Sequence, residues 1–360
     1  MAASTSNEST NSVVEDAAIH PFRIEVPQDE IDELRRRVPP LSAHGHVPGF
    51  DGATGWLNSA PLMVADLRGH VVLIDFWTFT CINWIRTAPY LRAWDEKYRD
   101  HGLTVIGVHT PEFPFETDID SIRAAIEDRR IAYPVAVDSD YAIWSAFVNR
   151  YWPALYIADA KGTIRFHHFG EGRYEESEQV IRQLLDVPRG LKDDPIEVEA
   201  NGVEAQADWA SLESPETYLG HERAERFASP GGAAWEQNQT YSPPARLRLN
   251  QWALSGDWTI GGKAARLNKA DGRLAYRFRA RDVHLVMGSA ERGESVRFRV
   301  RIDGSPPTAA RGVDVDDHGE GTAAYRRLYQ LVRQPGAVAE RTFEITFLQP
   351  GVEAYVLTFG

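Results

Sequence analysis

The sequence predicts an α/β domain with a central mixed sheet covered by helices, followed by an all-β sandwich. In the first half of the chain, short apolar segments alternate with segments whose apolar residues recur at helical spacing. After about residue 205 the period changes to two, with Gly and Pro between the alternating segments. A chain of 360 residues is long enough to build both domains, each with its own core.

The composition is that of a globular protein, with 43% hydrophobic and 25% charged residues. A net charge of −13 disfavours a nucleic acid or an anionic membrane as a partner. No apolar run approaches the roughly 20 residues that cross a bilayer. The polar N-terminus lacks the pattern of a secretory signal, and a single cysteine fits a reducing compartment. We therefore expect a cytoplasmic protein; export is the alternative if a signal peptide precedes this sequence.

Changes in composition along the chain indicate five regions. The first residues offer little to bury, which is typical of disorder, and the apolar residues after Pro27 indicate a helix that Pro39 and Pro40 end. The acidic stretch with Pro188 and Pro195 is typical of a linker. The predicted regions are a disordered tail at 1–19, a strand–helix extension and loop at 20–55, the α/β domain at 56–187, the linker at 188–205 and the sandwich at 206–360.

The α/β domain begins with four consecutive apolar residues, Val71–Ile74, which suit a strand buried on both faces. A helix follows, with apolar residues at helical spacing at Ala88, Leu91, Trp94 and Tyr98. Leu103–Val108 predicts a second buried strand. The alternation continues with a helix bearing Ile122 and Ile126, a short strand at 133–138, helical turns at 141–148, a hairpin of 154–158 with 164–166, and a helix at 180–185.

The sandwich is predicted by segments in which apolar and polar residues strictly alternate. Val296, Phe298, Val300 and Ile302 alternate with arginines up to the turn pair Asp303–Gly304. The same pattern occurs at 274–279 and 343–347, and a last strand is expected at 352–359. Such segments each have one buried and one solvated face, as in two packed antiparallel sheets.

Cys81 lies where the first strand gives way to a helix, and it is the only cysteine in the chain. Unpaired backbone N–H groups and the positive end of the helix dipole favour a thiolate at such a position. Any thiol chemistry of this chain must therefore be carried by Cys81.

The residues around Cys81 resemble a known family. Leu73–Trp77, followed by Cys81-Ile82-Asn83-Trp84 and Pro89, is similar to the active-site region of the thioredoxin-like thiol–disulfide oxidoreductases. Within them the chain is most similar to the soluble part of the DipZ group of cytochrome c biogenesis proteins, whose active site reads Cys-Ile-Asn-Cys. Further matching stretches are 107–113 and 149–154, and the likeness runs from about Gly55 to the C-terminus. A short N-terminal piece resembles the N-terminal segment of epoxide hydrolases, without that family's catalytic residues.

The resemblance implies roles for several residues near Cys81. Asp75 takes the place of the buried acid beneath the active-site thiols and would accept the thiol proton; the alternative is an Asp that forms hydrogen bonds at a strand end. Pro153 takes the place of the cis-proline that faces the cysteine. Thr78 with Cys81 matches the short Thr-x-x-Cys pattern of peroxiredoxins, a match that chance explains about as well.

Other residues are candidates by their position in the sequence. Arg86 is a candidate for lowering the thiol pKa by its charge, or else a structural arginine. The resemblance also implies that Trp77, Trp84 and Trp152 crowd around Cys81, either as the rim of a pocket for an apolar or aromatic substrate or as a plug. The chain has no cysteine cluster and no Gly-rich phosphate loop, so we expect neither a metal nor another cofactor.

The chain departs from the family at Trp84, which occupies the position of the second cysteine and cannot resolve a mixed disulfide. Three hypotheses follow. Cys81 attacks a disulfide or a peroxide as a single-cysteine redox centre, and an external reducing thiol resolves the product. Cys81 is a covalent nucleophile in non-redox chemistry. The domain has lost its chemistry and serves as a binding or scaffold protein.

The sandwich resembles the carbohydrate-binding-module-like domain that follows the thioredoxin-like domain in the DipZ group. The resemblance makes carbohydrate a candidate ligand, stacked on exposed aromatic rings. Candidate rings for such a platform are Trp235, Tyr241, Trp252, Trp258 and Tyr329. The alternative is that these rings fill the sandwich core or the seam between the domains.

Overall fold

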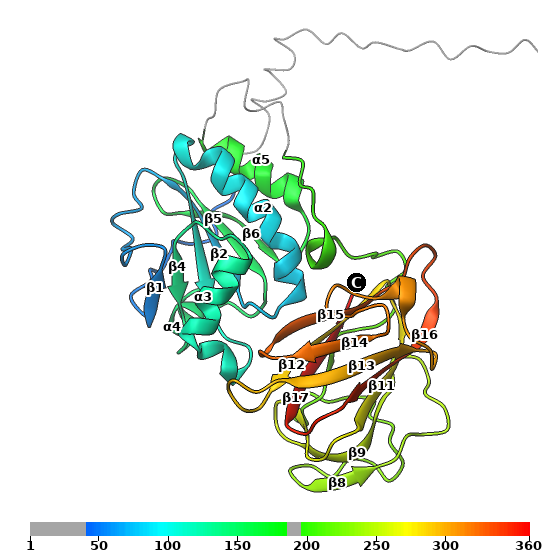
Figure 1. The fold of residues 1–360 in the computed structure, drawn as a ribbon. Helices are drawn as coiled ribbons and strands as arrows, with labels where there is room; N and C mark the ends of the chain where they lie inside the picture. Colours follow the sequence, from blue (N-terminus) through cyan, green and yellow to red (C-terminus); the bar gives the residue numbers. More distant parts are fainter. Residues whose placement is uncertain (1–40, 186–195) are drawn as a thin grey trace, which may run out of the picture. The chain divides into compact units, whose positions relative to one another are not determined.

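β2 (Val71–Trp77) lies at the centre of the first sheet of the protein (Figure 1). The computed structural model describes residues 41–185 and 196–360. The predicted tail, the predicted strand and helix of the N-terminal extension and the start of the linker lie outside the described residues, whereas the predicted loop at 41–55 lies within them. The sheet has the order β1-β4-β3-β2-β5-β6, in which β2, β3 and β4 are parallel and the other pairs are antiparallel. The prediction of a mixed sheet is confirmed.

The remaining elements of this α/β part follow the predicted alternation. None of its helices within the described ranges is long and apolar enough to span a membrane. The strands are β1 (Gly55–Leu57), β3 (Leu103–His109), β4 (Val135–Val137), β5 (Ala154–Ala158) and β6 (Ile164–Phe169). The helices are α2 (Ile82–Tyr98), α3 (Ile119–Asp128), α4 (Ala142–Ala146) and α5 (Tyr174–Leu185), with short 3-10 turns η1 (Arg99–His101) and η2 (Pro114–Thr117).

All seven residues of β2 are buried because both faces of the strand are covered. Val72, Ile74 and Phe76 point to one face and pack in a core with Ile143 and Phe147. The alternate residues face α2 and α5, which contact each other through the hydrogen bond from the Tyr98 hydroxyl to Glu178. Burial on both faces explains the apolar run, and it makes the one charged residue in it, Asp75, conspicuous.

The structure extends some predicted elements and adds one. α5 begins at Tyr174, six residues before the predicted start. The prediction missed the first turn because that turn is polar and shows no apolar pattern. Its acidic residues, Glu175 and Glu176, stabilise the start of the helix. β1 was not predicted; it is three residues long, forms the edge of the sheet and pairs with β4. A segment this short has too few residues to show a periodicity.

The C-terminal part is all-β, as predicted, and every strand pair in its ladder is antiparallel. β9 joins two layers, and the apolar faces of both layers share one core that includes Phe298 and Leu285. Its strands are β7 (Thr217–Tyr218), β8 (Asn238–Tyr241), β9 (Trp252–Ile260), β10 (Ala265–Leu267), β11 (Gly272–Arg279), β12 (Asp282–Ser289), β13 (Val296–Ile302), β14 (Glu320–Ala323), β15 (Arg327–Arg333), β16 (Glu340–Phe347) and β17 (Val352–Phe359). The 3-10 turns η3 (Gly202–Glu204) and η4 (Thr308–Ala310) complete the described elements.

Residues 42–360 form one compact unit that contains both the α/β part and the sandwich. Side chains of the two parts therefore meet within one unit. The boundaries at 56–187 and 206–360 remain a prediction.

Candidate active site

Cys81 is the N-cap residue of α2, as the sequence predicts; the residue keeps some exposed surface, while its thiol group is enclosed by the protein. Its backbone is extended, and its carbonyl accepts the first helical hydrogen bond, from the Ile85 N–H at 2.9 Å. The thiol lies 3.7 Å from the carbonyl oxygen of Trp152. The peptide bond between Trp152 and Pro153 is cis, as the resemblance implies. The start of a helix and this loop thus hold one sulfur between them.

Trp84, at the position of the second cysteine, is fully buried in the first turn of α2. Its indole Nε1 donates a hydrogen bond of 2.8 Å to Oδ2 of Asp75. Its ring stacks on Trp77, with ring centroids 4.2 Å apart. Trp84 therefore fills the space of a resolving thiol and also satisfies part of the hydrogen-bonding demand of the buried acid.

Asp75 is completely buried in β2. Burial raises its pKa to about 7, against the hydrogen bond from Trp84, which lowers the pKa. Its Oδ1 has no hydrogen-bond partner among the described residues. A carboxyl group with this pKa can exchange a proton near neutrality, which fits the role of proton acceptor that the resemblance implies.

The pKa of Cys81 is raised well above its ordinary value. Burial is the main cause, and the negative charges of Glu112 and Glu216 act in the same direction. Backbone hydrogen bonds from Trp84 and Asn83 at the helix start oppose this shift without cancelling it. The thiolate expected from the helix start is therefore disfavoured, because burial and the acidic surroundings outweigh the helix terminus.

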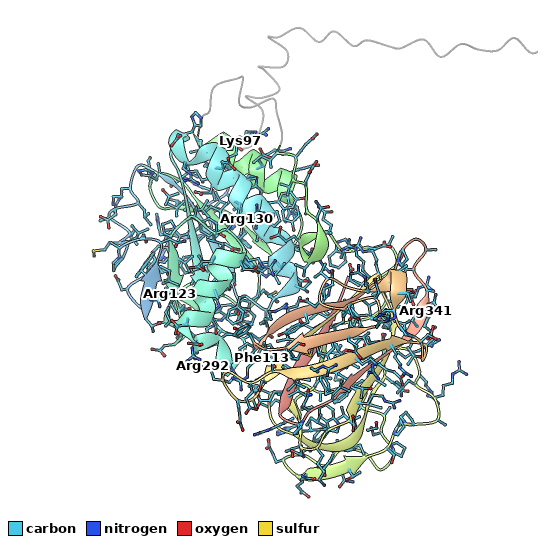
Figure 2. The ribbon with its side chains drawn as sticks, viewed as in Figure 1. Lys97, Phe113, Arg123, Arg130, Arg292 and Arg341 are labelled. Atoms are coloured by element: carbon cyan, nitrogen blue, oxygen red, sulfur yellow. The ribbon has the colours of Figure 1, made fainter. Side chains whose placement is uncertain are left out.

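Glu112 links the segment after β3 to the sandwich. It accepts hydrogen bonds from the Tyr218 hydroxyl at 2.6 Å and from Nη1 of Arg223 at 2.7 Å. Nearby, Phe113, labelled in Figure 2, lies 5.0 Å from Tyr355 between ring centroids. The acidic surroundings of Cys81 are thus held in place by side chains of the sandwich.

Two further buried titratable groups lie in this region, and the sequence did not indicate a role for either. Glu116 accepts hydrogen bonds from the Thr80 hydroxyl and from the backbone N–H groups of Glu112 and Phe113, and burial raises its pKa to about 7. His109 is fully buried, and burial lowers its pKa to about 3, so it is neutral. The available signal was position: both follow or end β3, whose C-terminal end lies beside that of β2.

The aromatic residues that were predicted to surround the thiol differ in how much of their surface is exposed. Trp77 and Trp84 have no exposed surface, so a role in lining a substrate pocket does not fit their position; they form a buried floor. Trp152 is partly exposed and donates from Nε1 to the carbonyl of Thr110 at 3.0 Å. Thr78 is also fully buried, and a substrate does not reach its hydroxyl in this structure. Trp152 therefore remains beside the sulfur with exposed surface, whereas Pro153, the next residue, is buried.

Arg86 lies in α2 but is 1% exposed and is paired with other groups. Its Nη1 lies 3.1 Å from Glu171 Oε1, and its Nη2 donates to the carbonyl of Phe359 in β17 at 3.4 Å. A guanidinium neutralised by a buried carboxylate does little to stabilise a distant thiolate. The structure therefore favours the structural alternative for Arg86, which joins α2 to the last strand of the sandwich.

Four of the five rings considered for a sugar platform lie in the sandwich core. Trp252 and Trp258 have no exposed surface, and Tyr329 and Tyr241 are almost completely buried. The alternative of core packing holds for these four, since they stand on the inward face of the layers. Trp235 remains, with 43% of its surface exposed, beside His221, whose Nε2 lies 2.6 Å from Glu236 Oε1.

Two family models match separate parts of the chain. Residues 46–167 match the AhpC/TSA family, and residues 214–360 match the family described as thioredoxin like C-terminal domain. A solved thioredoxin-like protein in the oxidised form is 30% identical, with a TM-score of 0.37, over 39% of this chain and 95% of that one.

Two relatives cover different shares of the chain. Protein DipZ of Mycobacterium tuberculosis is 38% identical over 273 residues, which are 74% of this chain and 38% of DipZ. The chain thus spans less than half the length of that relative. Thiol-disulfide oxidoreductase YkuV of Bacillus subtilis is 30% identical over 139 residues, which are 39% of this chain and 93% of YkuV. On these matches, the chain belongs to the thioredoxin-like redoxin family.

Proposed function

We propose that the protein is a thiol–disulfide oxidoreductase that works with one cysteine and depends on an external thiol. The observation that carries the proposal is the position of the Cys81 sulfur, at the start of α2 and 3.7 Å from the Trp152 carbonyl oxygen, with Trp84 in the place of a second thiol. A mixed disulfide formed there has no partner in the chain to resolve it, since the sequence holds one cysteine.

The reaction balances in two exchanges. Cys81 gives up its proton, its sulfur attacks one sulfur of a small disulfide, and the second sulfur leaves as a thiolate that takes up a proton. An external small thiol then attacks the mixed disulfide, which restores the Cys81 thiol and yields a new disulfide. Asp75, with its pKa raised to about 7 by burial, is the proposed proton acceptor. Trp152 and Pro153 are the proposed contacts for the substrate.

Mass spectrometry of the intact protein tests this function. Incubation with bis(2-hydroxyethyl) disulfide should add one mercaptoethanol to the protein, and addition of a small thiol should remove it. The Cys81→Ser variant, which differs by one atom at the sulfur position, should show no adduct. Absence of an adduct on the parent protein at neutral and alkaline pH would overturn the proposal.

Hydrogen peroxide is the second substrate class for the same sulfur. Peroxide would convert Cys81 to a sulfenic acid with release of water, and two external thiols would return it to the thiol. The buried Thr78 does not support a peroxide contact, so disulfide exchange is the preferred chemistry. Trapping of a sulfenic acid by dimedone after peroxide treatment decides between the two.

A binding or scaffold protein is the second candidate function, and the raised pKa of Cys81 favours it. A thiol that stays protonated reacts slowly with disulfides and alkylating agents. For this candidate we expect no mixed disulfide, and the exposed Trp235 is the proposed place for a carbohydrate ligand. A Trp235→Ala variant that binds a glycan array as the parent does would remove that assignment.

A role of Cys81 as a non-redox nucleophile predicts instead an acyl or alkyl adduct that thiols do not reverse. A reducing compartment such as the cytoplasm is the proposed location for each candidate.

A further inference from the structure

A cavity of about 340 Å³ lies in the sandwich segment that reaches Glu112. Its lining includes Tyr218 and Arg223, the two residues that bind Glu112, together with Glu216, Glu225 and Arg226. The volume is at the small end of the range for ligand sites, which begins at roughly 300 Å³. The cavity therefore suits a compact ligand of amino-acid size.

Some of the charges in this cavity are already used within the protein. Arg223 forms an ion pair with Glu112 at 2.7 Å, and its Cζ lies 3.3 Å from the centre of the Tyr218 ring. Glu216 accepts a hydrogen bond from the Tyr218 hydroxyl at 2.9 Å and keeps further acceptor capacity. Arg223 is thus committed, whereas Glu216 is only partly satisfied.

Glu225 and Arg226 are available for a ligand. Neither side chain forms a hydrogen bond or an ion pair with any of the residues that the structure describes, and both are exposed at the cavity. Their backbone is fixed: the Glu225 carbonyl accepts from Trp252 Nε1 at 2.7 Å, and the Arg226 carbonyl accepts from the Trp252 N–H at 3.3 Å. Arg226 also has a positive φ of 58°. A free carboxylate and a free guanidinium are therefore presented side by side from a fixed backbone.

The cavity is coupled to Cys81 through its acids. The Tyr218 hydroxyl lies 2.6 Å from Glu112 Oε1 and 2.9 Å from Glu216 Oε2, so its single proton is shared between the two carboxyl groups. The Glu112 backbone N–H donates to Glu116 at 2.6 Å, and Glu116 also accepts from the hydroxyl of Thr80, the residue before Cys81, at 2.5 Å. Hydrogen bonds thus connect the cavity to the start of α2, and the charges of Glu112 and Glu216 act to raise the pKa of Cys81. The cavity and the sulfur therefore share one electrostatic environment, although one comes from the sandwich and the other from α2.

We propose that the cavity binds a small zwitterionic disulfide of the amino-acid type, with its ammonium group at Glu216 and Glu225 and its carboxylate at Arg226, and presents it to Cys81. This inference rests on the proposed thiol–disulfide exchange and names its substrate class. An ammonium group at Glu216 offsets part of the negative charge near Cys81 and so favours the thiolate when substrate is bound. The same acids add to the effect of burial in keeping Cys81 protonated in the free enzyme, and they repel substrates that carry only carboxylates.

Four disulfides that differ in charge test the substrate class. Cystine carries both charges, cystamine only ammonium groups, 3,3′-dithiodipropionate only carboxylates, and bis(2-hydroxyethyl) disulfide none. For each disulfide, the rate of adduct formation at Cys81 is divided by the rate at which the same disulfide reacts with free mercaptoethanol, which removes differences in intrinsic reactivity. We expect this normalised rate to fall from cystine to cystamine, then to bis(2-hydroxyethyl) disulfide, and to be lowest for 3,3′-dithiodipropionate. Arg226→Gln should lower the cystine-to-cystamine ratio roughly tenfold, the effect of one charge-assisted hydrogen bond. Arg246→Gln is the matched control, since Arg246 is exposed outside the cavity, and it should leave the ratio unchanged.

Calorimetric titration of the Cys81→Ser protein with cystine separates the inference from the chemistry. Binding that Arg226→Gln or Glu225→Gln weakens supports the cavity even if Cys81 proves unreactive. Equal normalised rates for all four disulfides, with no cystine binding to Cys81→Ser, would overturn the cavity while leaving the proposed exchange intact. Failure of all four to form an adduct would overturn the exchange, and the calorimetry alone would then decide on the cavity.

Discussion

The indole nitrogen of Trp84 donates a hydrogen bond of 2.8 Å to the carboxylate of Asp75, at the place where the family has a second thiol above a buried acid. In a dithiol site such an acid serves the two sulfurs. Here one of its oxygens is held by a residue with no redox chemistry. The replacement therefore changes the partner of the acid as well as the number of thiols.

Returning the second cysteine should return the dithiol. In Trp84→Cys we expect mild oxidation to remove both thiol hydrogens, because the new thiol stands one helical turn from Cys81. Loss of a fully buried tryptophan should lower the free energy of unfolding by about 3–5 kcal/mol. Mass spectrometry and urea unfolding measure both effects, with Trp84→Ser as the control that has the cavity but no thiol. Two free thiols after oxidation would show that the helix start no longer supports the family's disulfide.

Asp75 should make the protein less stable as the pH rises. Its folded pKa of about 7 lies above its ordinary value of 3.8, so the folded state binds this proton more tightly than the unfolded chain. The associated stability is complete below about pH 4 and is lost as the pH rises to about 7. The free energy of unfolding of Asp75→Asn, relative to that of the parent, should rise by up to roughly 4 kcal/mol between pH 4 and pH 8. Denaturant unfolding of both proteins at both pH values measures this change. If the relative free energy is the same at the two pH values, Asp75 is not held as a buried acid. Asn retains an oxygen that can accept from Trp84.

Glu112 should restrain the reactivity of Cys81. Its charge contributes to the raised pKa of the thiol, so Glu112→Gln should lower that pKa and speed alkylation by iodoacetamide several-fold at pH 8. Glutamine keeps an acceptor for Tyr218 and so retains much of the contact. Glu127→Gln, on the exposed surface of α3, is the matched control. Equal alkylation rates for the two variants would contradict the electrostatic account of the site.

The pair of Arg86 with Glu171 should matter for stability. Arg86→Met leaves the carboxylate of Glu171 buried without its partner, which typically costs about 3–5 kcal/mol. Adding Glu171→Leu should recover much of that loss, because the uncompensated charge is removed. Urea unfolding of the single and double variants measures this. A higher thiol pKa in the double variant would instead restore the predicted role of Arg86 as an activator of Cys81.

Much of the fold could be predicted because periodicity reports local burial. The apolar run of β2 and the alternation in β13 each reflect the faces that these strands bury. β1 and the polar first turn of α5 escaped, since three residues or a solvated turn leave little pattern. At the site, Cys81, Asp75, Trp152 and Pro153 were indicated by resemblance. Tyr218 and Arg223 were not, because they come from a distant segment of the sandwich.

The sequence by itself determined that this protein has one thiol at the start of a helix and a tryptophan where a second thiol would stand. Only the tertiary structure decided the state of that thiol. Its pKa depends on burial and on the charges of Glu112 and Glu216, which come from separate parts of the chain. Electrostatic interactions act through space and not along the chain, so their sum is known only once the fold has brought these groups together.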